Sequence, residues 1–382
     1  MNFKMDKTQS HPVLIDGSRL IAEACVRAGA DAYVGYPITP ASLIFFYASR
    51  RFPIALPAPD EITALQWMAG LSAAGHLPVS ATSFPGFALM VESVNMAYMV
   101  ELPMLVILVQ RLGPATGTAT AGAQGDLLLL NGLISGGYPL PVFCISDLED
   151  CWLLPPVALQ TAVDLRTPVV LLTSKEMVMT QESFDLARLA EIEPVRRTFY
   201  EGPGPYCTYD AGDGLVPPFL PVGNGQHQIR LNASTHDRCG IIQHTSDEAM
   251  ANTRRLQAKV EAGTPVLYHL DEQEEAEILV VTYDITTGAA REAVTALRAQ
   301  GVPVSLLVLR TLLPLPTVYL ETIDRYPRVV VAEENHQGQL AHLLFGRRIP
   351  PHVRTVTAIG RMIRPDEIVG ATLAVAPLAV AL

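Results

Sequence analysis

Two patterns of apolar and polar positions alternate along the first half of the chain. Short apolar runs are typical of buried strands, and longer stretches with apolar positions three or four residues apart are typical of helices. The runs predict strands at residues 32–36, 79–82, 104–109, 141–145 and 168–172, with helices at 18–28, from about 39, at 60–74 and at 86–100. Strands that alternate with long helices require crossover connections, so the sequence predicts a parallel α/β sheet.

The pattern changes near residue 190. Residues 191–232 are rich in proline and glycine and show little periodicity, which predicts a long structured loop or an extension over a neighbour. A polar helix is expected at about 247–261, and a second α/β unit begins near residue 275. We therefore expect a first domain at 1–245, a connecting segment at 246–264 and a second domain at 265–382.

Hydrophobic residues make up 49% of the 382 residues and charged residues only 17%. This surplus of apolar surface indicates either partner chains or a membrane segment. The longest apolar stretch, residues 87–109, is interrupted by Glu92 and Glu101, and the run at 372–382 is shorter than the roughly 20 residues that cross a bilayer. The first twelve residues also lack the apolar region of a signal peptide. A cytoplasmic hetero-oligomer with no membrane segment is therefore expected.

Charge and cysteine usage exclude several classes. A net charge of −11, with no block of lysine or arginine, argues against nucleic-acid binding. The five cysteines form no CxxC pair, so no iron–sulfur cluster or zinc ribbon is expected on this chain, and separate thiols are typical of a reducing compartment. The spacing of His236, Cys239 and His244 matches no established site, so no metal site is predicted. The usual glycine-rich nucleotide loops are absent.

Three junctions between an expected strand and the next helix carry candidate chemistry, because ligands of parallel sheets bind beyond the carboxyl ends of the strands. The first junction is GYPITPAS, residues 35–42. Thr39 is expected to cap a helix that has Pro40 in its first position. The free backbone N–H groups of such a helix suit a carboxylate. An ordinary capped helix explains the same spacing.

The second and third junctions hold Glu61 and Arg111. Glu61 follows Asp60, which already complements the helix dipole, and precedes a nearly all-apolar stretch, so its carboxylate is either buried or simply part of a first helical turn. Arg111 ends the strand MLVILVQR before a loop of Gly, Ala and Thr. It is placed either to bind a carboxylate or phosphate or to lie at the surface. All three candidates are expected to face one crevice.

The same stretches resemble a known family. GYPITPAS, PDEITALQWMAGLSAAG, ATSFPGFALMVESVNMAYMVELPMLVILVQR and GPATG followed by AQGDLL are similar, in order and in register, to the α subunit of 2-oxoacid:ferredoxin oxidoreductases, the 2-oxoglutarate enzymes in particular. The likeness continues through DLEDCW, STHD, LVLRTLLPLP and VVVAEENHQGQL. It therefore covers nearly the whole chain.

The resemblance implies a fold, cofactors and partners. The expected fold is a PYR-type thiamine-diphosphate-binding parallel-sheet domain followed by a transketolase C-terminal-like α/β domain. Thiamine diphosphate would be shared with a β subunit that carries the diphosphate-binding domain, Mg²⁺ and a [4Fe–4S] cluster. Separate γ and ferredoxin-like subunits, ferredoxin, coenzyme A and a 2-oxoacid are the further expected partners.

The resemblance also implies roles for individual residues. Glu61 matches the glutamate that activates the aminopyrimidine of the cofactor, and Thr39 and Arg111 match residues that hold the substrate carboxylate. Further cofactor contacts are implied for Pro37, Ser83 and Pro85. The expected reaction is CoA-dependent oxidative decarboxylation of a 2-oxoacid, with 2-oxoglutarate as the expected substrate and ferredoxin as the electron acceptor, or its reverse.

One departure from the family bears on the substrate. Related 2-oxoglutarate enzymes carry charged residues between the Gly-Pro-x-Thr-Gly and Gln-Gly-Asp elements, whereas this chain has the uncharged TATAGA. A less polar 2-oxoacid therefore stays open as the substrate. The sequence also fits an E1 β-type subunit of a 2-oxoacid dehydrogenase, a transketolase relative, or a non-catalytic scaffold subunit that retains the fold.

Overall fold

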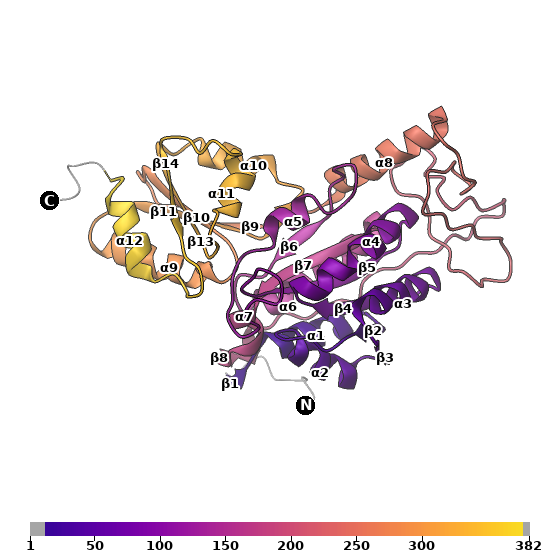
Figure 1. Ribbon diagram of the computed structural model, residues 1–382, viewed down its shortest axis with the longest axis horizontal. Helices are drawn as coiled ribbons and strands as arrows, with labels where there is room; N and C mark the ends of the chain where they lie inside the picture. The colour runs from indigo at the N-terminus through magenta and orange to yellow at the C-terminus, as the bar shows by residue number, and fades with distance from the viewer. Residues whose placement is uncertain (1–11, 377–382) are drawn as a thin grey trace.

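A seven-stranded sheet organises the N-terminal half of the computed structural model, which describes residues 12–376 (Figure 1). Its order is β12-β6-β7-β5-β4-β2-β3, and the six strands from this half run parallel. These strands are β2 (Ala32–Gly35), β3 (Ile54–Pro57), β4 (Pro78–Thr82), β5 (Met104–Gln110), β6 (Val142–Cys144) and β7 (Pro168–Ser174). The connecting helices are α1 (Gly17–Arg27), α2 (Ser42–Arg51), α3 (Glu61–Ala73), α4 (Phe84–Val100), α5 (Leu127–Asn131), α6 (Asp150–Leu165) and α7 (Lys175–Met179). The predicted parallel α/β class is confirmed.

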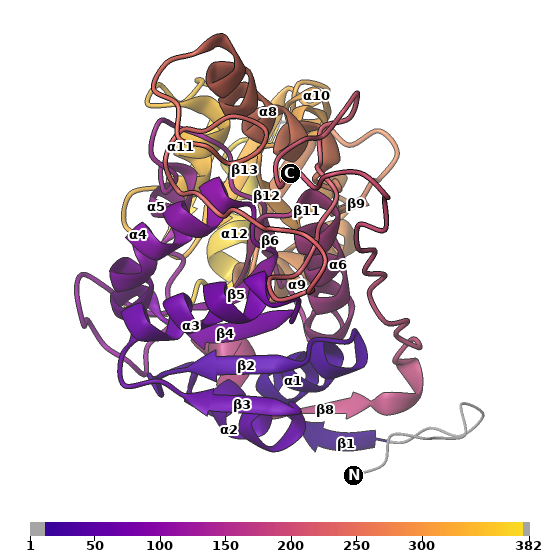
Figure 2. The ribbon, with the colours of Figure 1, turned by 90° about the vertical axis from the view of Figure 1, so that its right-hand side faces the viewer.

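Helices cover both faces of this sheet. Strands β5 and β7 are buried at every position, as expected of apolar runs at the centre of a parallel sheet. Helices α3 and α4 pack on one face, and α1, α2 and α6 pack on the opposite face, each group over its own hydrophobic core. Figure 2 shows β5, β4, β2 and β3 in succession across the sheet.

A second α/β unit follows, with the sheet order β14-β13-β10-β11-β9. Its strands are β9 (Tyr268–Asp271), β10 (Ile278–Thr282), β11 (Val304–Leu309), β13 (Arg328–Glu333) and β14 (Val353–Thr357), and its helices are α9 (Thr286–Ala299), α10 (Thr317–Ile323), α11 (Gln339–Phe345) and α12 (Pro365–Leu373). Strand β12 (Thr311–Leu313) leaves this unit and pairs antiparallel with β6 of the first sheet. One apolar core continues from α3 and α4 into β10 and β13. The two units are therefore joined by shared packing.

The segment between the units begins with β8 (Glu182–Asp185), which pairs antiparallel with β1 (Pro12–Ile15) from the start of the described chain. The 3-10 helix η1 (Leu186–Arg188) follows β8. An extension at residues 190–245 follows with only isolated bridges, as expected of its proline and glycine content. It leads into α8 (Asp247–Gly263). Figure 1 shows the extension and the second unit on opposite sides of the first sheet.

A buried cluster of charges fixes α8 to the first sheet. The Glu101 carboxylate accepts from Lys259 Nζ at 2.7 Å and from Arg255 Nη1 at 3.0 Å. Burial opposes ionisation of Glu101, but the two cations outweigh it and hold its pKa at about 2. Arg166 Nη1 donates to the Thr208 carbonyl at 2.9 Å and so ties in the extension. Removal of the Glu101 carboxylate would leave Lys259 buried without an ion-pair partner.

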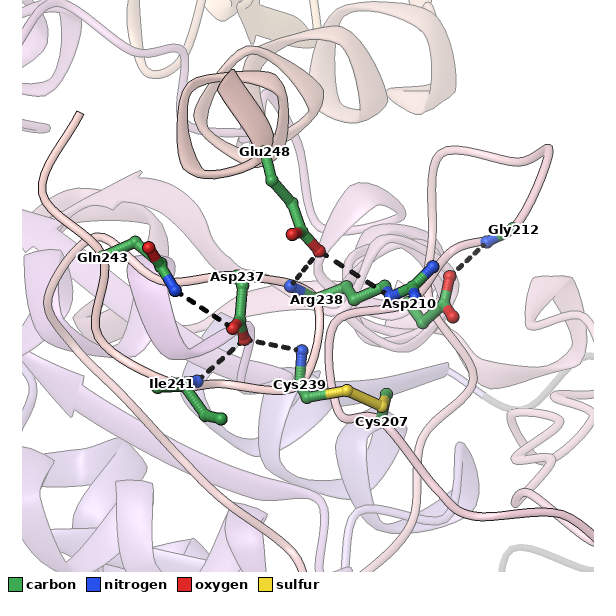
Figure 3. The surroundings of a disulfide bond; sticks show 9 residues. All are labelled: Cys207, Asp210, Gly212, Asp237, Arg238, Cys239, Ile241, Gln243 and Glu248. Carbon is green, nitrogen blue, oxygen red and sulfur yellow. Dashed lines mark hydrogen bonds and ion pairs between the residues drawn. A yellow bond between two sulfur atoms is a disulfide. The ribbon is translucent and has the colours of Figure 1, made fainter. Parts of the chain in front are cut away.

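The extension is cross-linked by a disulfide between Cys207 and Cys239, 32 residues apart in the sequence (Figure 3). Next to it, the Tyr209 N–H donates to the Arg238 carbonyl at 2.9 Å, and the Asp237 carboxylate accepts from the Cys239 N–H at 3.0 Å. The sequence-based interpretation of five separate thiols is therefore wrong for this pair. The fold brings the two together in an irregular segment where spacing carries no signal. Cys25, Cys144 and Cys151 are free and buried.

Loss of the disulfide is expected to destabilise the extension. Replacing Cys207 with Ser removes a cross-link over 32 residues, which in the chain-entropy model is worth about 3–4 kcal/mol. The unfolding temperature without reductant should fall, and dithiothreitol should bring the wild type close to the variant. Cys25→Ala is the matched control and should retain the response to reductant. Five titratable thiols in denatured, unreduced wild type would contradict the bond.

Candidate functional site

The candidate residues lie at one edge of the first sheet. Strands β5, β4, β2 and β3 are neighbours and parallel, so their carboxyl ends share an edge. Thr39 follows β2, Glu61 follows β3, Ser83 follows β4 and Arg111 follows β5. This is the edge at which parallel sheets bind ligands.

Arg111 contacts Thr39 directly. Its Nη1 donates to the Thr39 carbonyl oxygen at 2.5 Å. Arg111 is 7% exposed, and its Nε is buried without a hydrogen-bond partner in the described chain. Burial also lowers the pKa of Arg111, with Asp126 acting in the opposite direction. A buried guanidinium with donors to spare is suited to an anionic ligand.

Thr39 does not cap a helix, contrary to the sequence-based expectation. Helix α2 begins at Ser42, and Ala41 holds the capping position without a side-chain hydrogen bond. Thr39 and Pro40 lie in a turn and are joined by a cis peptide bond. Thr39 contacts Arg111 through its backbone carbonyl oxygen, which accepts a hydrogen bond. The expectation that Thr39 opens a helix whose free N–H groups face a ligand is therefore wrong.

Glu61 is buried at the start of α3, with 6% of its surface exposed. Asp60 caps the helix, since its carboxylate accepts from the Thr63 N–H at 2.7 Å, so Glu61 is not needed for capping. Within residues 12–376 the Glu61 carboxylate has no hydrogen-bond or ion-pair partner. A Cβ on Gly86 would lie 2.4 Å from Glu61 Oε1. Glycine at this position therefore leaves room for the carboxylate.

The three remaining predicted contacts differ in their surroundings. Ser83 precedes α4, and its hydroxyl is buried without a partner in the described chain. Pro85 lies half-buried in the first turn of α4, whereas Pro37 is exposed in the loop after β2. The Ser83 hydroxyl is thus a buried polar group without a partner, whereas Glu61 is buried as a residue and its carboxylate has no partner within residues 12–376.

The sequence interpretation missed Gln110 and Asp126. Gln110 closes the fully buried strand β5, and its Oε1 accepts from the Asp126 N–H at 3.2 Å. Burial raises the pKa of Asp126 to about 7, although Arg111 acts to lower it. One signal was present in the sequence, because a polar residue that ends an all-apolar strand must have a partner.

His236 and Cys239, two of the residues considered as metal ligands, are engaged in other contacts. His236 Nδ1 lies 2.7 Å from the Ser234 carbonyl, its Nε2 lies 3.0 Å from Asn252 Nδ2, and Cys239 is in the disulfide. No group of three His, Cys, Asp or Glu side chains suited to a metal occurs between residues 12 and 376. Over the same range, no helix has both the length and the apolar character to cross a membrane.

Family models match most of the chain. The thiamine-diphosphate-binding domain of pyruvate flavodoxin/ferredoxin oxidoreductases matches residues 23–255, and core domain II of pyruvate:ferredoxin oxidoreductase matches residues 276–368. The chain belongs to this oxidoreductase family. The resemblance inferred from the motifs and the thiamine-diphosphate-binding class of the first unit are therefore confirmed.

Several curated proteins align with most of this chain. The 2-oxoglutarate oxidoreductase subunit KorA of Mycobacterium tuberculosis is 32% identical over 93% of the chain, which spans 56% of that relative's length. The 2-oxoglutarate synthase subunit KorA of Archaeoglobus fulgidus is 28% identical, with 93% and 97% covered. The ketoisovalerate oxidoreductase subunit VorB of Methanothermobacter thermautotrophicus is 30% identical, with 91% and 92% covered. These names agree with the predicted enzyme class, and neither the E1 interpretation nor the scaffold interpretation has better support.

A solved structure shares the fold. The 2-oxoglutarate:ferredoxin oxidoreductase from Magnetococcus marinus, with 2-oxoglutarate, coenzyme A and succinyl-CoA bound, superposes with a TM-score of 0.86 and 27% identity. The match covers 94% of this chain and 64% of that one. A split-gene transketolase, at 14% identity and a TM-score of 0.54, shows a likeness of fold alone.

Gly86→Ala tests the close approach to Glu61. The added methyl would meet Glu61 Oε1 at 2.4 Å and Thr82 Oγ1 at 2.3 Å, so the carboxylate must move. We expect a loss of about 1–3 kcal/mol in unfolding free energy and a fall in cofactor-dependent turnover. Gly370→Ala, on an exposed helical face with open space around it, is the control and should be neutral or stabilising. Unchanged turnover in Gly86→Ala would contradict the crowding.

Asp126→Asn tests the buried carboxyl beside Arg111. The folded pKa of about 7 exceeds the ordinary value of 3.8, so the folded chain keeps a proton that the unfolded chain loses. This contribution to stability is complete below about pH 4 and is lost as the pH rises to about 7. The variant should flatten the fall in unfolding free energy between pH 5 and pH 7 by up to about 1.4 kcal/mol per pH unit. Denaturant titrations at several pH values measure it, and an unchanged slope would contradict the raised pKa.

Proposed function

We propose that this chain is the α-type subunit of a thiamine-diphosphate-dependent 2-oxoacid:ferredoxin oxidoreductase. The observation that carries the proposal is the buried carboxylate of Glu61, which has no partner within residues 12–376. It lies at the same sheet edge as the contact between Arg111 and Thr39. A buried carboxylate without a partner is costly unless a ligand satisfies it.

The residues present fit the cofactor. Thiamine diphosphate, when bound, supplies a carbanion for attack on a 2-oxo group. Glu61 would hold or transfer the proton at the ring nitrogen of the aminopyrimidine. Further contacts to the cofactor are proposed for Pro37, Ser83 and Pro85, and the buried Ser83 hydroxyl supports its part.

Arg111 would bind the carboxylate of the 2-oxoacid. Its charge lies in a buried setting, where attraction to a carboxylate is stronger than in water. The Thr39 carbonyl accepts from Nη1 and orients the guanidinium, while Nε remains free to donate. Thr39 would therefore act on the substrate partly through Arg111.

Partner chains would supply what this chain lacks. We propose that a β subunit binds the diphosphate with Mg²⁺ and carries the [4Fe–4S] cluster, with γ and ferredoxin-like subunits where present and ferredoxin and coenzyme A as reaction partners. Exposed apolar side chains on α3 and α4 support a partner there: Ile62 at 44%, Trp67 at 41% and Leu89 at 52%. The division at residues 245 and 265 and a cytoplasmic location remain part of the proposal.

The test uses the complex with its partner subunits. The wild-type complex is expected to oxidise a 2-oxoacid with coenzyme A and a viologen dye. 2-Oxoglutarate is the first substrate to test, beside pyruvate and 2-oxoisovalerate because the TATAGA loop is uncharged. Glu61→Gln should lower kcat by about 10²–10⁴-fold, the usual contribution of a positioned acid or base.

Asp60→Asn provides the matched control, because it changes the neighbouring carboxylate and keeps a capping side chain. Its activity should stay close to that of the wild type. More than a tenth of wild-type kcat in Glu61→Gln would remove Glu61 from the mechanism. No turnover of any 2-oxoacid by the assembled wild type would overturn the proposed function.

A further inference from the structure

Gln110 connects the end of β5 to the second unit. Its side chain is fully buried, and its Nε2 donates to Asp284 Oδ2 at 2.9 Å. Its Oε1 accepts from the Asp126 N–H at 3.2 Å. This amide, immediately before Arg111, thus links the end of β5 to a residue 16 positions later and to a residue 174 positions later.

Asp284 has two features that its local sequence does not require. It lies between β10 and α9 with φ at 51°, a conformation that a residue other than glycine rarely adopts. It is also fully buried, which raises the pKa of its carboxyl well above the ordinary value, with Glu334 and Glu176 adding to the effect. Strained, buried polar residues persist where the surroundings over-determine them, often at functional sites.

We propose that Asp284 is a positioning residue for Arg111, acting across the junction of the two units through the side chain of Gln110. The Asp284 carboxyl accepts from Gln110 Nε2, and the same amide holds the backbone N–H of Asp126, whose charge acts on Arg111. The inference rests on the proposed role of Arg111 in binding the substrate carboxylate. Asp284 itself need not touch substrate.

The test removes the side chain without adding backbone strain. Asp284→Gly tolerates a φ of 51°, and Gln110→Leu removes the amide. Measured in the assembled complex, both variants should raise the KM for the 2-oxoacid about fivefold, the effect of one lost hydrogen bond, and leave kcat within about twofold. Asp284→Asn tolerates the same conformation and still accepts from Gln110, so it should restore the wild-type KM.

A double-mutant cycle separates positioning from general destabilisation. Arg111→Lys should itself raise KM, and adding Asp284→Gly to it should change KM little, because the group being positioned is gone. Glu333→Ala is the matched control. It removes a buried carboxyl of the same unit that accepts from the Leu340 N–H at 2.7 Å and makes no contact with Gln110, so it should lower the unfolding temperature and leave KM unchanged.

Three results would overturn the inference. The first is an unchanged KM in Asp284→Gly while Arg111→Lys raises KM, in which case the proposed function stands. The second is an Asp284→Asn variant as impaired as Asp284→Gly, since the hydrogen bond would then not be what matters. The third is an unchanged KM in Arg111→Lys. That result would contradict both this inference and the role of Arg111 in substrate binding. The role of Glu61 would still be decided by the Glu61→Gln variant.

Discussion

The side chain of Gln124 joins the two α/β units, and the geometry of the candidate site depends on it. Its Nε2 donates to the Tyr283 carbonyl at 2.7 Å, and its Oε1 accepts from Thr286 Oγ1 at 2.8 Å and from the Glu334 N–H. Its backbone N–H donates to the Glu334 carbonyl at 2.8 Å. An amide satisfied in this way costs little to bury and admits one arrangement of its partners. The loop that follows Arg111 is therefore fixed at its far end by the second unit.

The junction around Gln124 contains buried carboxyl groups. Burial raises the pKa of Glu334 to about 7 and that of Asp284 well above the ordinary value. Burial in a medium of low polarity disfavours the charged form of a carboxyl, which is the cause of both shifts. Burial of carboxyl groups also affects the surroundings of Arg111. Its neighbour Asp126 is also partly neutralised by burial, which weakens competition with an incoming carboxylate.

The sequence located the sheet edge well because its signals are local. The apolar run at residues 104–109 corresponds to β5, Met104–Gln110. The apolar surroundings of Glu61 left its burial open, and the structure shows that the residue is buried. A strand and the polar residue after it occupy consecutive positions, so both can be recognised from the sequence alone. The resulting placement of Arg111 beside Thr39 then follows from parallel topology.

The features that escaped prediction depend on tertiary structure. Local preference favours Thr39 as a helix cap, but it does not reveal the isomer of the following proline bond, and the turn displaced the helix start to Ser42. Gln110 and Asp284 are 174 residues apart, and no spacing rule connects them. The disulfide joins two cysteines within an irregular extension, where the path of the chain is set by anchors such as Arg166.

The loop at residues 112–123 bears on the choice of substrate. The Gly122 N–H donates to Glu176 Oε1 at 3.1 Å. A Cβ at Gly122 would lie 1.7 Å from Glu176 Oε2, so the loop backbone is in close contact with this acidic side chain. Lys175 Nζ lies 3.7 Å from the same carboxylate. The TATAGA stretch adds no cation of its own. The Lys175 ammonium compensates the negative charge of Glu176 at this distance, so the pair presents no net charge to a group beside the loop. The charged groups next to this loop are therefore Glu176 and Lys175, and the loop itself supplies none that could select between a charged and an uncharged distal group.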